Sequence, residues 1–232
     1  MSDAAVAKFD ATRAAEYDRQ SRIALAGYEA CHELTACVLA ASLGAGSERT
    51  LLVVGAGTGQ EIIAIGRHAP RWRFTAVDPS PAMIEAAEAS LASSALRDRT
   101  TLRCSHLHEL PVERHDGATL IGVLHHLAGA APRAALLRDI AARLAPGAPF
   151  VLACNFRRYE REPLLIAAWK ERWRQHGAAP DEVAAKFITI TQGVEPPDSE
   201  QDVLDHLAAA GFANGRLFFA SLFWGAWIAH KA

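Results

Sequence analysis

The chain lacks several features that would assign a protein to a class at once. Its 232 residues include four cysteines and no CxxC pair (Cys31, Cys37, Cys104 and Cys154). This indicates free, buried thiols in a reducing compartment, not a disulfide framework. No apolar run reaches the roughly 18 residues of a membrane-spanning helix. The first twenty residues are charged and lack the apolar core of a secretory signal, so we expect a cytoplasmic protein.

An excess of charge of one sign is also missing. The 24 basic and 26 acidic side chains give a formal net charge of −2. Basic residues are mixed with acidic ones, as where Arg157 and Arg158 stand near Glu160 and Glu162. This mixture is typical of solvated helix faces, whereas a nucleic-acid footprint is more one-sided. We therefore expect neither a nucleic acid nor a membrane as partner.

Motifs for several common chemistries are absent as well. No GxSxG nucleophile context occurs, and no GK[ST] follows the glycine-rich run at residues 55–59, which excludes a P-loop. His125 and His126 are adjacent, so they point in different directions, and no ligand stands at metal-binding spacing around them. We expect no metal. Two alternatives stay open for His125: a structural role, or a general base that faces the substrate.

What is present is an alternation of short apolar runs with helical patterns. The expected strands cover residues 51–54, 72–77, 100–104, 118–123 and 149–154, and the expected helices between them cover 59–68, 80–95 and 132–145. Strands that are apolar throughout are covered on both faces, and alternation with helices implies parallel pairing through right-handed crossovers. An aromatic-rich hairpin at residues 215–231 adds two strands. The fold class is therefore α/β, with a doubly wound, mainly parallel sheet of seven strands.

The pattern divides the chain into four segments. Residues 1–45 form an N-terminal helical lid, with a helix over 11–43, and residues 46–154 form the α/β core. Residues 155–197, with helices at 160–176 and 180–190, form a helical cap insertion. Residues 198–232 hold the last helix, which begins at a capping box from Ser199 to Asp202, and the hairpin that completes the sheet.

The most informative run is Val53-Val54-Gly55-Ala56-Gly57-Thr58-Gly59-Gln60-Glu61. A glycine-rich turn between a first strand and a first helix lets the backbone approach a ligand closely. Its GxGxG spacing differs from the dinucleotide fingerprint, GxGxxG. Thr58 and Glu61 also form a possible TxxE capping box, which would use helix donors that a phosphate would otherwise take. Asp78 ends the next strand, where its carboxylate can accept hydrogen bonds from both ribose hydroxyls; the alternative is a plain turn with a helix cap.

On these residues the chain resembles the class I S-adenosylmethionine-dependent methyltransferases. VVGAGTGQE resembles their motif I and FTAVDPSPAMIEAAE their motif II, while ATLIGVLHHL and LAPGAPFVLA resemble the segments at the fourth and fifth strands. The resemblance covers residues 50–154 and implies S-adenosyl-L-methionine as cofactor. It implies that the cofactor is bound by the glycine loop, the acidic residue and their neighbours: Gly55, Ala56, Gly57, Gly59, Asp78, Pro79, Met83, Val123 and Tyr17. Many relatives place an Asp after the third strand to meet the adenine; here Ser105 and His106 occupy that region.

The N-terminal segment resembles the lid of a subgroup of this family. That subgroup includes small-molecule methyltransferases and carboxy-S-adenosylmethionine synthases, which share a YD…R…GYE pattern; Ala26 stands here where the synthases usually carry Pro. The resemblance places the segment over the cofactor. We expect Tyr28 to present an aromatic face to the sulfonium, on one helix face with Leu25 and His32, and Arg22 to anchor an acidic group in the site.

Together these observations predict methyl transfer from S-adenosylmethionine to an O, N or C nucleophile of a small-molecule acceptor. Catalysis of this reaction depends mainly on positioning and exclusion of water, with a general base where the nucleophile needs one. Two alternatives stay open: an enzyme that modifies the cofactor itself, like the carboxy-S-adenosylmethionine synthases, and a non-catalytic binding module. The one protein partner considered is a second copy of the chain, in a homodimer.

Overall fold

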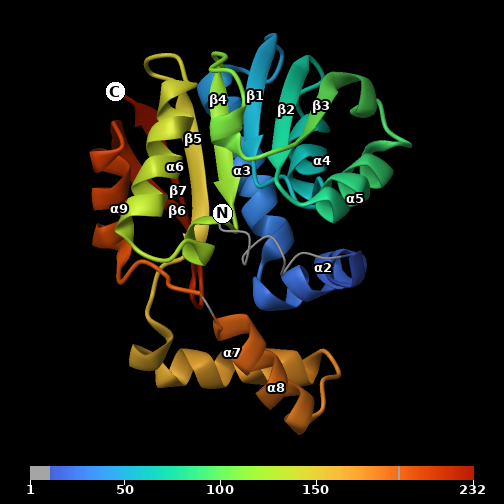
Figure 1. The fold of residues 1–232 in the computed structure, drawn as a ribbon, viewed down its shortest axis with the longest axis vertical. Coiled ribbons are helices and arrows are strands. Elements are labelled where there is room, and N and C mark those ends of the chain that lie inside the picture. The colour runs from blue at the N-terminus through green and yellow to red at the C-terminus, as the bar shows by residue number, and fades with distance from the viewer. Residues whose placement is uncertain (1–10, 193) are drawn as a thin grey trace.

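The computed structural model describes residues 11–192 and 194–232, and a single mixed sheet runs through them (Figure 1). Its strands are β1 (Arg49–Val54), β2 (Trp72–Asp78), β3 (Thr100–Cys104), β4 (Gly117–Ile121), β5 (Pro149–Asn155), β6 (Phe212–Ser221) and β7 (Trp224–Lys231). Their order is β3-β2-β1-β4-β5-β7-β6. β1 to β5 pair in parallel, and β7 runs antiparallel between β5 and β6. The predicted α/β fold with seven strands is confirmed, and the hairpin makes the sheet mixed.

The helices described are α2 (Ala11–Ala24), α3 (Tyr28–Leu43), α4 (Gln60–Gly66), α5 (Pro81–Leu91), α6 (Ala130–Ala142), α7 (Pro163–Gln175), α8 (Pro180–Thr191) and α9 (Glu200–Ala209). The described residues also contain short 3₁₀ turns between these elements: η1 (Arg97–Arg99), η2 (Leu107–Glu109), η3 (Leu124–His126) and η4 (Tyr159–Arg161). Ser199 caps α9 as predicted, because its hydroxyl accepts a hydrogen bond from the Asp202 N–H.

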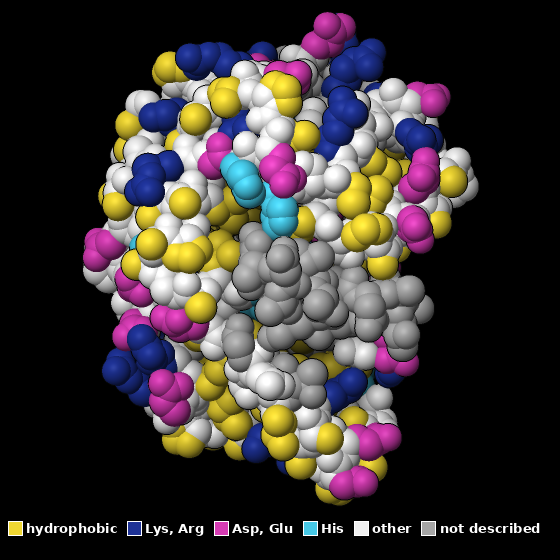
Figure 2. Space-filling view, in the orientation of Figure 1, with side chains coloured by type: hydrophobic (Ala, Val, Ile, Leu, Met, Phe, Trp, Pro, Cys, Tyr) yellow, Lys and Arg dark blue, Asp and Glu magenta, His cyan; other side chains and the backbone are white. Residues whose placement is uncertain are grey.

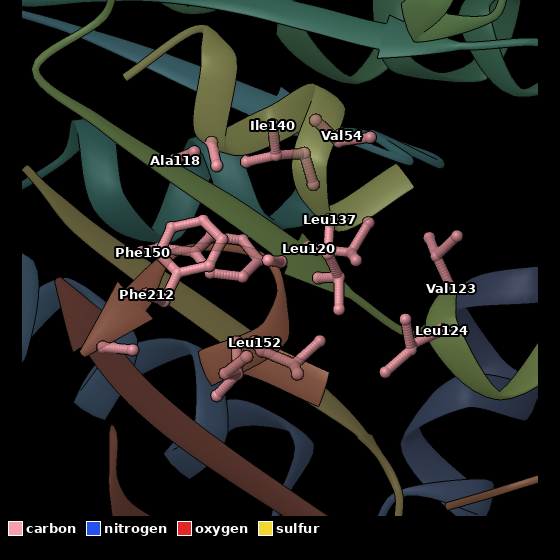
Figure 3. Close-up of a cluster of buried hydrophobic side chains, with 14 of the residues drawn as sticks. Val54, Ala118, Leu120, Val123, Leu124, Leu137, Ile140, Phe150, Leu152 and Phe212 are labelled. Atoms are coloured by element: carbon pink, nitrogen blue, oxygen red, sulfur yellow. The ribbon is translucent and has the colours of Figure 1, made fainter. Parts of the chain in front are cut away.

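Helices cover both faces of the sheet, as the apolar strands require. On one face, Leu39 of α3 and Ile62 and Ile65 of α4 pack against Leu51 and Val53 of β1. On the other face, α6 and α9 pack over β4 and β5, where the Phe150 and Phe212 rings stack with centroids 4.7 Å apart (Figure 3). Alternate residues of β1 therefore enter opposite cores, as the two-residue period of a strand demands.

α5 packs against β2 and β3, whereas α7 and α8 lie away from the sheet, and α7 contacts α2 (Figure 1). Trp169 and Arg172 of α7 tie them to the end of α2. The Trp169 indole donates to the Ala24 carbonyl, and the Arg172 guanidinium donates to the carbonyls of Ile23 and Arg22, all at 2.9 Å. α2, α7 and α8 thus form one helical layer, named here the α2/α7/α8 layer.

The N-terminal segment differs from the single helix expected over residues 11–43. The chain breaks between Ala24 and Tyr28, where Gly27 takes a left-handed φ of 82°. α2 joins α7 and α8, but α3 packs on the sheet and belongs to its covering layer. The buried thiols expected at all four cysteines hold for Cys31 and Cys154, whereas Cys37 and Cys104 are exposed.

The surface carries charges of both signs. Basic and acidic side chains are interspersed over the face in Figure 2. Within the described ranges, no helix combines the length and the apolar character needed to cross a bilayer.

Candidate active site

The glycine loop lies at the carboxyl end of β1 and follows a tight path. Gly55 has a φ of 72°, which is the left-handed region, and its N–H donates to the Val77 carbonyl at 2.8 Å. A Cβ on Gly55 would lie 2.2 Å from Cγ2 of Val123, so no larger residue fits. Val123, a predicted cofactor residue, therefore supports the loop by packing against Gly55.

The two other glycines of the loop have different surroundings. Gly59 precedes α4 with a φ of 80°, and a Cβ there would meet Ala87 of α5 at 3.4 Å. Gly59, expected to bind the cofactor, thus serves the close packing of α4 on α5. At Gly57, a Cβ would meet Cε1 of Tyr17 at 3.7 Å and nothing nearer in the described residues. The loop backbone at Gly57 therefore faces open space beneath the Tyr17 ring. A ligand could lie in this space against the backbone.

Asp78 is bound to the glycine loop by its carboxylate. Oδ2 accepts a hydrogen bond from the Gly57 N–H at 3.0 Å, and Oδ1 accepts one from the Ser80 N–H at 2.9 Å. Burial raises the pKa of Asp78, and the two hydrogen bonds oppose that rise. Each oxygen keeps a lone pair for a further donor, so the site can accept two ribose hydroxyls. The helix cap considered as the alternative is also present. The Ser80 hydroxyl accepts a hydrogen bond from the Met83 N–H in the first turn of α5.

The other residues predicted near the adenine lie around the ends of β2 and β3. The Ser105 N–H donates to the Asp78 carbonyl at 3.1 Å, which holds the two strand ends together. The Ser105 hydroxyl donates to Glu109, and the His106 N–H donates to the same carboxylate. Met83 is buried and Pro79 is half-buried.

A cavity adjoins the glycine loop and extends under the α2/α7/α8 layer. Gly55, Ala56, Gly57 and Thr58 form one side of it. Its other walls are largely aromatic and apolar, and they include Tyr17, Leu25, Tyr28, Ile121, Tyr159, Trp169, Trp173 and Trp224. Asp78, Pro79, Met83, Ser105 and His106 do not line this cavity. The predicted cofactor residues therefore form two groups, which the hydrogen bond from Gly57 to Asp78 joins.

His125 lines the cavity, but its hydrogen bonding does not favour a base role, one of the two alternatives that the sequence left open. Burial, followed by the charges of His126 and Arg133, lowers the pKa of His125 well below its usual value, so the ring is neutral. Its Nδ1 accepts a hydrogen bond from the Asn155 N–H at 3.4 Å, which assigns the proton to Nε2. His125 can therefore donate a hydrogen bond into the cavity. Within the described ranges, no group of three His, Cys, Asp or Glu side chains is arranged to hold a metal ion.

His32 has the opposite arrangement. Its Nδ1 lies 2.8 Å from the Tyr28 carbonyl, to which it can only donate, so Nε2 carries a lone pair. Burial lowers the pKa of His32 and keeps the ring neutral. Burial also raises the pKa of Tyr28, whose phenol stays protonated. Tyr28 and His32 both line the cavity. The helix face expected for them and Leu25 is wrong for Leu25, which lies in the break before α3 and lines the cavity from there.

Arg22 does not line the cavity, contrary to the role expected for it. Its Nε donates to Glu29 at 2.7 Å, and its guanidinium carbon lies 4.9 Å from the centre of the Tyr28 ring. The pair with Glu29 is exposed, so it contributes little to stability. The guanidinium is thus held over Tyr28 and away from the cavity.

The predicted TxxE capping box is wrong. The Thr58 hydroxyl donates to Asp18 of α2, and the Gln60 amide donates to the other oxygen of Asp18 at 2.9 Å. Gly59, with no side-chain cap, precedes α4. The polar residues of the loop therefore bind α2 and hold it over the glycine loop.

Glu61, taken from sequence as a capping residue, is instead buried under the glycine loop. It is 5% exposed and lines the cavity. The Thr119 hydroxyl lies beside its carboxyl group, but neither that hydroxyl nor Oε1 completes a hydrogen bond of normal geometry within the described residues. Burial raises the pKa of Glu61 to about 7. A buried carboxyl with an unused oxygen at the cavity wall is typical of a functional group.

Sequence reasoning also missed the aromatic wall. Trp169 and Trp173 stand four residues apart on α7, so they share a helix face, and this spacing was a usable signal. Asn155 ends β5 at the ligand-binding edge of the sheet, and its amide donates to the Tyr159 hydroxyl at 2.6 Å. Nothing in the sequence alone showed that Trp224 of the hairpin would reach the same cavity.

Comparison with known proteins gives a family match over the core. Residues 52–150 match a family model described as a methyltransferase domain. A search of curated protein sequences gave no match.

Solved structures share the fold. Magnesium protoporphyrin IX methyltransferase from Synechocystis PCC 6803, solved with S-adenosylhomocysteine bound, is 15% identical, with 99% of this chain and 100% of that chain covered and a TM-score of 0.68. Mitomycin 7-O-methyltransferase is 17% identical, with 88% and 54% covered and a TM-score of 0.64. An O-methyltransferase family 2 protein from Planctomyces limnophilus DSM 3776, solved with apigenin, is 19% identical, with 88% and 62% covered and a TM-score of 0.62. The chain spans little more than half the length of the latter two.

The family match covers β1 to the start of β5, and it contains the glycine loop and Asp78. The seven-stranded fold extends over nearly the whole chain in the Synechocystis enzyme. Residues 52–150 are therefore similar to a methyltransferase domain, and the fold of the chain is that of solved methyltransferases.

Proposed function

We propose that this protein transfers the methyl group of S-adenosylmethionine to a small-molecule acceptor. One observation carries the proposal: the cavity extends from the backbone of Gly55–Thr58 to an aromatic wall under the α2/α7/α8 layer. A ligand on the glycine loop and a second molecule against the aromatic wall would share this space. The covering helices favour a small acceptor.

Different residues of the chain bind different parts of the cofactor. Asp78 accepts the ribose hydroxyls, and Gly57 lets the backbone approach the methionine part of the cofactor. The cofactor supplies a methyl group already activated by the positive charge of its sulfonium. Tyr17 and Tyr28 exclude water from that end and present aromatic faces, which attract a cation by roughly 0.5–2 kcal/mol.

Where the acceptor has to lose a proton, His32 is the base that the hydrogen bonding supports. It is neutral, its Nε2 lone pair is not used by the Tyr28 carbonyl, and it lines the cavity. His125 serves as a donor that orients an oxygen or nitrogen of the acceptor. This assignment gives the base role, one of the two alternatives for His125, to His32, and it rests on the ring nitrogens of the two residues.

The alternative of a carboxy-S-adenosylmethionine synthase receives less support. Such an enzyme must hold the carboxylate that it adds, and no Arg or Lys lines the cavity in the described ranges. Arg22, the candidate from the sequence, is held by Glu29.

The test is a screen with S-adenosylmethionine labelled on its methyl group and pools of phenols, amines and acids, read by mass spectrometry. We expect a labelled acceptor and S-adenosylhomocysteine in equal amounts. A carboxylated adduct in the purified protein would favour the synthase alternative. Binding of S-adenosylmethionine without transfer to any pool would favour a binding module.

A further inference from the structure

We infer that the acceptor is an aromatic molecule with a basic, protonated nitrogen, and that Glu61 recognises the resulting cation. This inference rests on the proposed function, because it assigns the acceptor side of the same cavity. It joins two independent observations: the chemistry of the wall, and a buried carboxyl group that has no cationic partner in the described residues.

The wall of the cavity selects for flat, apolar surface. Tyr28, Tyr159, Trp169, Trp173 and Trp224 bring rings to it from α3, η4, α7 and β7. The rings also pack on one another: the Tyr159 and Trp169 centroids lie 5.9 Å apart, and the His125 and Trp224 rings are nearly perpendicular with centroids 5.2 Å apart. Offset and edge-to-face packing of this kind accommodates another aromatic ring.

Charge in the cavity comes from Glu61. No Arg or Lys lines the cavity in the part of the chain that the structure describes. Three arginines near it have other partners. Arg22 donates to Glu29, Arg172 donates to the carbonyls of Arg22 and Ile23, and Arg133 donates to the carbonyls of Leu127 and Glu195. An acidic or phosphorylated acceptor would therefore meet no counter-charge here.

Glu61 itself lacks a compensating cation. No ion pair involves it within the described residues, and its Oε1 has no hydrogen-bond partner there, although the Thr119 hydroxyl lies beside the carboxyl group. Glu61 and Tyr28 line the same cavity, so the carboxyl group shares that space with the aromatic wall. A buried carboxylate is costly unless it is paired. A bound ammonium would supply the pair, and the surrounding rings would stabilise the same cation.

The test uses four small probes that differ in one group each, titrated calorimetrically into protein saturated with S-adenosylhomocysteine. The probes are 2-phenylethylamine, 2-phenylethanol, 3-phenylpropionate and 2-cyclohexylethylamine. We expect 2-phenylethylamine to bind tightest, 3-phenylpropionate weakest, and the cyclohexyl amine more weakly than its aromatic counterpart.

The variant Glu61→Gln keeps the shape and removes the charge. It should weaken binding of 2-phenylethylamine by about 10- to 150-fold and leave 2-phenylethanol unchanged. The matched control is Glu33→Gln, an exposed position on α3 that should alter neither. The ratio of amine to alcohol affinity is the decisive readout, because a misfolded variant would lose both.

Three outcomes would overturn the inference. The first is tight binding of 3-phenylpropionate, and the second is binding of none of the four probes by protein that holds S-adenosylhomocysteine. The third is a Glu61→Gln variant with weaker S-adenosylhomocysteine binding but an unchanged ranking of probes, which would assign Glu61 to the cofactor. Each of these leaves methyl transfer itself intact. Failure to bind S-adenosylhomocysteine at all would instead contradict the proposed function.

Discussion

The buried carboxyl group of Glu61 makes a quantitative prediction about stability and pH. Its pKa is raised by burial from 4.5 to about 7, while the unfolded chain keeps the ordinary value. Between these two values the folded protein holds a proton that the unfolded chain has lost. The contribution of Glu61 to the free energy of unfolding is therefore largest below pH 4.5 and is lost as the pH rises through 7.

The magnitude follows from linkage. One pKa unit corresponds to about 1.4 kcal/mol, so the Glu61 contribution should fall by about 2.5 kcal/mol between pH 5 and pH 8. Glu61→Gln cannot ionise and should lack this loss. The measurement is the free energy of unfolding in urea at several pH values, for wild type and variant without ligand. Their difference cancels other groups, including Asp78, whose pKa is also raised by burial.

The result that would refute this reasoning is a pair of parallel stability curves. Parallel curves would mean that Glu61 ionises at its ordinary pKa, and hence that it is solvated or paired. The exposed control, Glu33→Gln, should run parallel to wild type in either case.

Four further predictions follow from the site. Asp78→Ala should weaken S-adenosylmethionine binding roughly 10- to 150-fold by calorimetry. The control Asp116→Ala, which loses a hydrogen bond from Thr50 at the other end of the sheet, should leave that binding unchanged. Equal affinities in both variants would contradict the ribose role of Asp78. Gly55→Val should abolish binding or folding, because its side chain would collide with Val123; a folded, active variant would contradict the loop geometry. His32→Asn should lower kcat about 100-fold or more for an acceptor that must lose a proton, and an unchanged kcat would return the base role to another group. Chelator treatment should leave activity intact, and loss restored by one divalent ion would show that a metal is needed.

The core of the fold could be predicted because each signal was local. Apolar strands at residues 51–54 and 149–154 and the helices between them follow from periodicity alone, and the switch to an antiparallel hairpin follows from the aromatic run at the end. Asp78 could be placed for the same reason, since it ends a strand that directly follows the glycine loop. The hydrogen bond from Gly57 to its carboxylate agrees with that placement.

The rest of the site depends on contacts between distant segments, which periodicity does not reveal. Glu61 looked like a capping residue because it stands three positions after Thr58, but Asp18 takes the Thr58 hydroxyl across 40 residues of chain. The sequence predicted that Arg22 would bind a ligand, but in the structure its guanidinium donates to Glu29. Tyr28 proved part of a buried cluster with Leu25 and Cys31, so it belongs to the core as well as to the cavity wall.

The most direct test of the central claim is a calorimetric titration of the purified protein with S-adenosylmethionine, repeated with Asp78→Ala. The glycine loop and Asp78 predict saturable binding of one molecule per chain and a marked loss of affinity in the variant. No saturable binding by the wild-type protein, or the same affinity in both proteins, would contradict the account.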